Sequence, residues 1–170
     1  MKVLMRLSIW LERAALAIAG VALLAMMMVT VIDVALRFLF QLTDGTSGLT
    51  FMGSVELVKY LLLAALLGAM AGHVEKSQVV VEVFTNKLGD AIKARIAGLN
   101  LLIFAAVGVV LVWGIHEAAR SAAEFGEVTQ DLAMPKFVIY EMAAVLLVIF
   151  TVRSLIHGIR GLVQGVDDGA

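Results

Sequence analysis

The chain has 170 residues, 62% of them apolar, with 13 basic and 14 acidic side chains. This balance offers no basic surface for nucleic acid, and the absence of cysteine excludes disulfides, thiolate nucleophiles and thiolate metal sites. Four membrane spans of about 20 residues each would leave only short connections and no room for a soluble domain. We therefore predict an all-α membrane protein, a single membrane domain over residues 1–170.

Uncharged stretches at residues 14–32 and 96–115 carry the membrane prediction. At 1.5 Å of rise per residue, each stretch makes a helix of roughly 30 Å, the thickness of the hydrocarbon core of a bilayer. Because lipid offers no hydrogen-bond partners, the backbone of such a stretch must satisfy itself within a helix. We predict four transmembrane helices, at approximately residues 10–40, 51–72, 96–118 and 137–157.

The first predicted helix could be mistaken for a secretory signal, because Met1 to Arg6 precede an apolar run. Glu12 and Arg13 interrupt its start, and the run exceeds the roughly 7–15 residues of a signal core. We expect a retained helix. Further along, Pro135 stands just before the fourth span, where its missing amide proton costs nothing.

Basic residues predict the orientation, because cytoplasmic flanks of spans carry an excess of lysine and arginine. Four spans place both termini on one side, together with nine of the 13 basic residues: Lys2, Arg6, Arg13, Lys76, Lys87, Lys93, Arg95, Arg153 and Arg160. The other four are Arg37, Lys59, Arg120 and Lys136. We therefore expect the N- and C-termini in the cytoplasm.

Residues 77–90 fit neither a span nor a plain loop. On a helix, Val79, Val83 and Phe84 share one face while Glu82 and Lys87 lie on the other. This pattern predicts a short amphipathic helix along the cytoplasmic membrane surface. The alternation of valines also fits a short strand, which would leave its edges unpaired.

Five ionisable residues lie within or at the edge of predicted spans: Asp33, Arg37, Glu56, Lys59 and Glu141. Charges near the bilayer centre cost about 2.5–3.5 kcal/mol, so they normally pair or face protein or water. Asp33 with Arg37, and Glu56 with Lys59, have the spacing of pairs on one helix face. All five lie toward the extracytoplasmic side, which suits a seam with a partner subunit. Simple snorkelling and intrahelical pairing at the interface is the alternative.

The three histidines each end a predicted span. His73 and His157 are expected at the cytoplasmic face and His116 across the membrane. A haem between His73 and His157, as in a b-type cytochrome membrane anchor, is therefore an alternative, since imidazoles are common axial ligands. Separately, Gly68 and Gly72 form a small-residue pair that lets helices approach closely, within a bundle or with a partner helix.

Four segments, in this order, resemble the small membrane subunit (DctQ-like) of tripartite ATP-independent periplasmic (TRAP) transporters. They are Asp33 to Phe38, Val55-Glu56-Leu57, Lys76 to Phe84 with Val79, Val81 and Glu82, and Thr129 to Tyr140 with Leu132, Pro135 and Tyr140. The resemblance covers nearly the whole chain. It departs from the family pattern at Gln78, where a histidine is common, and at Lys136 and Phe137, near which a tryptophan is common.

The resemblance implies a noncatalytic subunit of the bacterial inner membrane, without a cofactor. Its partners would be a large multispan membrane subunit, which carries an organic anion with sodium, and a periplasmic binding protein, which delivers that anion. Partner-interface residues would be Asp33, Arg37, Glu56, Lys59, Gly68, Gly72 and Glu141, and residues docking the binding protein would be Asp44, Glu124, Glu127, Asp131 and Lys136. The remaining alternative is an independent small-solute exporter, but acids in the spans gather near one face and form no relay through the bilayer.

Overall fold

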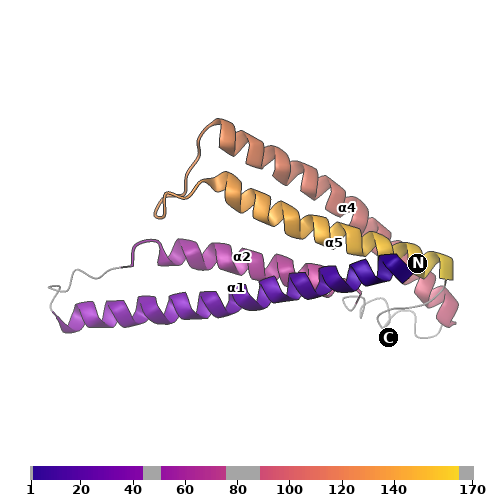
Figure 1. Cartoon of the computed structure of the whole chain (residues 1–170), viewed down its shortest axis with the longest axis horizontal. Coiled ribbons are helices and arrows are strands. Elements are labelled where there is room, and N and C mark those ends of the chain that lie inside the picture. Colours follow the sequence, from indigo (N-terminus) through magenta and orange to yellow (C-terminus); the bar gives the residue numbers. More distant parts are fainter. Residues whose placement is uncertain (1, 44–50, 76–88, 165–170) are drawn as a thin grey trace.

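The computed structural model describes residues 2–43, 51–75 and 89–164, and these residues form four α-helices (Figure 1). The helices are α1 (Lys2–Leu42), α2 (Ser54–Gly72), α4 (Asp90–Glu124) and α5 (Lys136–Gln164). Each is long and apolar enough to cross a membrane, which confirms the predicted all-α membrane fold. Residues 77–88 of the predicted amphipathic segment lie outside the described residues.

The helices are longer than the predicted spans, with one exception. The 41 residues of α1 make a rod of about 60 Å, twice the hydrocarbon thickness, whereas the 19 residues of α2 make one of about 28 Å. The second helix also begins three residues later than predicted, because Gly53 precedes it with a left-handed φ of 88°. Only α2 therefore matches the bilayer in length, and the other three helices must tilt or project beyond it.

The four helices pack as two hairpins. In Figure 1, α1 lies along α2, and α4 lies along α5 at an inclination to the first pair. The fifth helix also contacts α2 and α1, so it joins the two hairpins. We call the end of the bundle where α1 begins and α5 ends the terminus end. The opposite end, where the α4–α5 connection returns toward the start of α2, is the loop end (Figure 1).

The core where α1, α2 and α5 meet is rich in alanine. One cluster contains Ala15 and Ala71 with Leu146, and a second contains Ala22 with Ala64. Small side chains let helix backbones approach closely in a membrane, where lipid removes the hydrophobic drive for helices to associate. The fold is therefore held by close backbone contact rather than by large side chains.

Glycines bring two pairs of helices into contact. A Cβ atom on Gly68 would lie 2.9 Å from the Ala15 carbonyl oxygen, so the Gly68 face packs on α1 of the same chain. Between α4 and α5, a Cβ on Gly98 would lie 2.8 Å from the Gly158 carbonyl oxygen, and one on Gly161 would lie 2.8 Å from the Ala94 carbonyl oxygen. Gly68 and Gly72 are predicted to lie at a contact within the bundle or with a partner helix, and both contact α1 of the same chain. The sequence pattern does not single out the glycines between α4 and α5.

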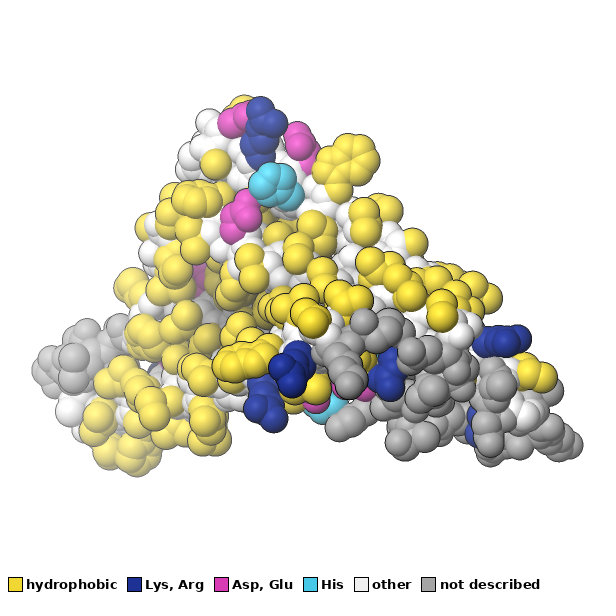
Figure 2. Space-filling model, turned by 45° about the vertical axis from the view of Figure 1, so that its right-hand side comes forward, with side chains coloured by type: hydrophobic (Ala, Val, Ile, Leu, Met, Phe, Trp, Pro, Cys, Tyr) yellow, Lys and Arg dark blue, Asp and Glu magenta, His cyan; other side chains and the backbone are white. Residues whose placement is uncertain are grey.

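Large apolar side chains cover much of the outer surface. Half of the apolar window of α5 is buried, at 50%, against 17% for α1, so α5 is the central helix. Figure 2 shows hydrophobic side chains over the middle of the visible face, with charged side chains at its top and along its lower part. Such a surface fits lipid or the helices of a partner subunit.

Candidate functional site

A fully buried arginine lies at the terminus end. Arg153 of α5 is 0% exposed, and its Nη1 donates to the carbonyl oxygens of Ala71 and Gly72, both at 2.6 Å. These are among the last carbonyls of α2, which have no partner within their own helix. The last turn of α2 carries no basic side chain of its own, so Arg153 supplies the positive charge that favours a helix C-terminus.

Two carboxylates and a serine complete the surroundings of this arginine. Its Nη2 donates to both oxygens of Glu75, at 2.9 and 2.8 Å, and to Glu12 Oε2 at 3.3 Å. Its Nε donates to Ser8 Oγ at 3.2 Å, and Ser8 Oγ lies 2.8 Å from Nε2 of His157. We call Ser8, Glu12, Glu75, Arg153 and His157 the Arg153 cluster. The paired charges and hydrogen bonds are what make a buried guanidinium tolerable.

The Arg153 cluster corrects one step of the sequence analysis. The orientation prediction counts Arg153 among the basic residues that flank the fourth span, but its side chain is buried among three elements. Without it, eight of the nine basic residues on the terminus side remain, still twice the four on the other side. The orientation prediction keeps its direction.

The two histidines considered for haem make different contacts. His157 is buried, with Nε2 within hydrogen-bond distance of Ser8 Oγ and 4.0 Å from Glu75 Oε2. His73 is exposed, with Nδ1 3.3 Å from the Ala69 carbonyl oxygen on its own helix. His157 therefore belongs to the Arg153 cluster, and this geometry gives no support to a role for the two histidines as axial ligands of a haem.

A carboxylate at the loop end makes a second polar contact between the hairpins. Glu56, in the first turn of α2, accepts backbone N–H bonds from Gln130 at 3.3 Å, Asp131 at 3.0 Å and Leu132 at 3.1 Å. Tyr60 Oη also donates to Glu56 Oε1 at 3.3 Å. We call this arrangement the Glu56 anchor. It fastens the α4–α5 connection to the start of α2.

The predicted Glu56–Lys59 ion pair is wrong. The carboxylate of Glu56 is directed to the backbone amides of the α4–α5 connection. Nζ of Lys59 instead lies 5.7 Å from the ring centroid of Tyr60. Glu56 binds the three amides in preference to the flexible Lys59 side chain, because the fold of the connection already fixes the positions of the amides.

The α4–α5 connection is itself held by internal hydrogen bonds. The Thr129 N–H donates to the Met134 carbonyl at 2.9 Å, and the Met134 N–H returns to Thr129 Oγ1 at 3.1 Å. The Lys136 N–H donates to the Glu127 carbonyl, and Lys136 Nζ pairs with Glu127 Oε2, both at 3.0 Å. The loop therefore presents its amides to Glu56 as a preformed unit.

The other predicted site residues are distributed over the loop end. The Asp33–Arg37 pair is confirmed at 2.9 Å. Glu141 of α5 lies 3.1 Å from Nδ1 of His116 on α4, with exposed fractions of 47% and 63% for the two side chains. The His116–Glu141 contact is open to the surroundings and adds little to stability, whereas the Asp33 side chain is only 16% exposed.

The docking residues were predicted as one set, and the structure places them in several contacts. Glu124 pairs with Arg120 at 3.2 Å, and Asp131 lines a cavity of about 400 Å³ together with Arg37, Gln130 and residues 51–55. This cavity joins Arg37 and Asp131, which the sequence analysis assigned to different surfaces. Asp44 lies outside the described residues.

Comparison with known proteins gives one family. The model of the family described as "Tripartite ATP-independent periplasmic transporters, DctQ component" matches residues 26–164. The match takes in α2, α4, α5 and the second half of α1, and so includes Glu56, Glu75 and Arg153. No curated protein and no solved structure matches the chain.

Proposed function

The chain belongs to the DctQ component family of TRAP transporters, and from this premise we propose that it acts as a rigid, noncatalytic scaffold for the large transport subunit. The family is a transporter component rather than a catalytic family. In the proposal, the large multispan subunit moves the substrate together with sodium, and this chain extends the stationary part of the complex. Four helices long and apolar enough to cross a membrane, in a chain of a transporter component family, support a multi-pass protein of the bacterial inner membrane.

The observation that supports a rigid scaffold is that α2 is fastened at both of its ends. The Glu56 anchor holds its first turn to the α4–α5 connection, and the Arg153 cluster holds its last turn to α5. Glu56 and Gly72 are separated by about 24 Å of helix, close to the hydrocarbon thickness. The polar contacts therefore fall near the two faces of the bilayer, where charged groups cost least, and the apolar contacts fill the interior.

We further propose that the loop end faces the periplasm and the termini lie in the cytoplasm. The eight basic flanking residues on the terminus side support this orientation. It would expose the α4–α5 connection to a periplasmic binding protein. Glu124, Glu127, Asp131 and Lys136 remain our proposed docking residues, with the 78% exposed Phe125 beside them.

The surface toward the large subunit is proposed to combine apolar faces with the polar groups Asp33, Arg37, Lys59 and Glu141. Glu56 would support that surface indirectly, since its carboxylate is engaged within the chain. Gly68 and Gly72 likewise contact α1 of the same chain, and so serve the bundle that presents the surface. The transported solute would be an organic anion, with selectivity set by the other chains.

Affinity purification in mild detergent tests the proposal. We expect the tagged chain to bring down a large multispan subunit, and its deletion to abolish uptake of the solute. Because the chain has no cysteine, single-cysteine variants at Glu127 and at Val3 can report sidedness through an impermeant thiol reagent in whole cells. Labelling at position 127 alone supports the orientation. Recovery of the chain by itself, with uptake unaffected by its deletion, refutes the scaffold role.

A further inference from the structure

The outer face of α1 carries a continuous apolar stripe. Every seventh residue from Val3 to Phe38, and every seventh residue from Leu7 to Leu42, is apolar and exposed, and we call these two series the α1 seam. The opposite face of α1 packs on α2 through Ala15. Figure 1 shows α1 along the lower edge of the bundle. Only 17% of its apolar window is buried, the smallest share among the four described helices, so the seam is left uncovered by the described residues.

The two ends of α1 show that the repeat is specific. Between residues 14 and 32 the helix is almost uniformly apolar, so a seven-residue repeat there carries little information. Residues 2–13 and 33–43 also contain charged and polar side chains, and every one of them falls outside both series. A strict apolar repeat of seven residues is the pattern by which two long helices pack along a shared left-handed supercoil. The seam is therefore built to meet another helix.

Lipid alone does not cover the seam. From Val3 to Leu42 the helix rises about 58 Å, and at the average tilt of a transmembrane helix it spans about 55 Å of depth. The hydrocarbon core is about 30 Å thick, and the whole bilayer with its headgroups about 40–45 Å. Val3 is 79% exposed and Leu42 65% exposed, and both lie beyond the reach of acyl chains. Covering the seam along its whole length therefore requires a protein partner.

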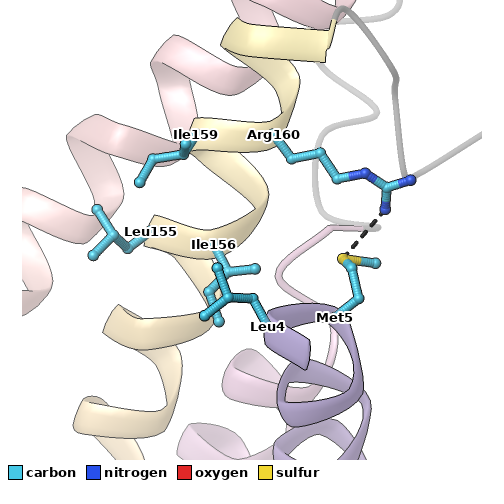
Figure 3. Close-up of a pocket in the computed structure, with 6 residues that line it drawn as sticks. All are labelled: Leu4, Met5, Leu155, Ile156, Ile159 and Arg160. Atoms are coloured by element: carbon cyan, nitrogen blue, oxygen red, sulfur yellow. Dashed lines mark hydrogen bonds between the residues drawn. The ribbon is translucent and has the colours of Figure 1, made fainter. Parts of the chain in front are cut away.

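The two flanks of the seam differ at the terminus end. One flank meets α5, where Leu4 and Ile156 are directed toward one another (Figure 3). The other flank carries Arg6 and Arg13, and both side chains are exposed. This second flank is positively charged and lacks a covering helix among the described residues.

The charge of this flank argues against a second copy of the chain as the partner. All copies insert in one orientation, so a second copy would bring the same arginines, Arg6 and Arg13, to the same contact. The acid of this part of α1, Glu12, directs its carboxylate to Arg153 and is not available to offset them. Charge complementarity therefore favours a different helix, with acidic or neutral side chains at this end.

From these features we infer that the α1 seam binds one long transmembrane helix of the large transport subunit, whose apolar side chains repeat at the same spacing. The inference rests on the proposed scaffold role and names the face of this chain that meets the partner. Asp33 and Arg37 lie on another side of α1, and so belong to a separate contact with that subunit.

Photocrosslinking in native membranes tests the inference, because a chain without cysteine accepts a benzophenone maleimide at one chosen position. We expect Leu24→Cys and Phe38→Cys, both on the seam, to give adducts with the large subunit that peptide mass spectrometry identifies. Val110→Cys on α4 should give few, although Val110 is 67% exposed against 64% for Leu24. Adducts between two copies of this chain, adducts with lipid alone, or equal adducts from Val110→Cys would overturn the inference.

A matched pair of tryptophan variants tests the packing. Ala17→Trp places a bulky side chain on the seam, and recovery of the large subunit with the tagged chain should fall about tenfold, as expected for overpacking a close contact. Ala106→Trp, at an exposed alanine of α4, should leave recovery unchanged. Circular dichroism checks that both variants keep their helices. Equal recovery with the two variants contradicts the seam contact and leaves the scaffold role standing. If the wild-type chain is recovered without a large subunit, the scaffold role and the inference both fail.

Discussion

The Arg153 cluster and the Glu56 anchor each fasten one end of α2 to a neighbouring element, but they differ in burial and in the groups they use. The cluster is buried, uses side chains from α1, α5 and the segment after α2, and satisfies a helix C-terminus. The anchor is only half-buried and uses one carboxylate on three backbone amides of a loop. A buried charge cannot turn to water when its partner is lost, whereas a partly exposed one can. Damage at the terminus end should therefore be global, and damage at the loop end local.

The largest effect is expected for Arg153→Ala. This variant leaves Glu75 buried without its bidentate partner and removes the donor to the last carbonyls of α2. The free energy of unfolding should therefore fall by about 3–5 kcal/mol. Titration with a denaturing detergent, followed by circular dichroism, measures the change. Arg95→Ala, at an exposed arginine, serves as the control and should be close to wild type.

The double variant Arg153→Met, Glu75→Met distinguishes two effects on stability: the loss of the ion pair, and the presence of a buried Glu75 charge without a partner. Replacing both members of a buried ion pair by apolar side chains is often nearly neutral. We therefore expect the double variant to be more stable than Arg153→Ala in the same titration. A double variant as unstable as the single one would show that the bonds to the Ala71 and Gly72 carbonyls dominate.

A smaller loss is expected for Gly53→Ala. Gly53 has a φ of 88°, where a Cβ costs about 1–2 kcal/mol, and its Cβ would come within 2.9 Å of Leu132 Cδ2. The loss should appear in the same unfolding titration. Adding Leu132→Ala should relieve the contact with the side chain and leave the backbone strain, so only part of the stability should return.

A local effect is expected for Glu56→Gln. The amide keeps the shape of the side chain and loses the charge that strengthens its bonds to the loop. Hydrogen exchange at Gln130, Asp131 and Leu132 should become faster, while exchange in the middle of α5 stays as in the wild type. Faster exchange throughout the bundle would contradict the view that damage at the loop end stays local.

The smallest effect is expected for Arg120→Gln. Its partner Glu124 lies one turn away on the same helix, and both side chains are more than half exposed. Exposed pairs of this kind contribute about 0.5 kcal/mol at most. The unfolding titration should barely distinguish the variant from wild type, and a loss comparable to that of Gly53→Ala would indicate a contact outside the bundle.

Several local features could be predicted from the sequence because they depend on neighbours along the chain. The Asp33–Arg37 pair follows from a spacing of four on one helix, and α5 begins directly after Pro135 as expected. The prediction of a Glu56–Lys59 pair was wrong because the three amides that bind Glu56 lie 74 to 76 residues away in the sequence. Sequence spacing carries no information about such a competitor.

The Arg153 cluster was missed for a related reason, although a signal existed. Ser8 and Glu12 are four apart on α1, and Arg153 and His157 are four apart on α5, so each helix presents a polar stripe at the same end of the bundle. Facing polar stripes in two apolar helices predict a contact between them. The sequence does not indicate which acid pairs with Arg153, or that Arg153 also binds the carbonyls of α2. Both depend on how three helices are aligned along one another.

Four helices long and apolar enough to cross a membrane could be predicted from the sequence alone, because hydrophobic length and backbone hydrogen bonding are properties of each segment. The packing of the helices determines which helices pair, that α5 is central, and that Arg153 is buried. Those outcomes depend on small residues that permit close approach and on the depth at which two helices meet. Both are relations between segments, and they exist only once the segments have packed.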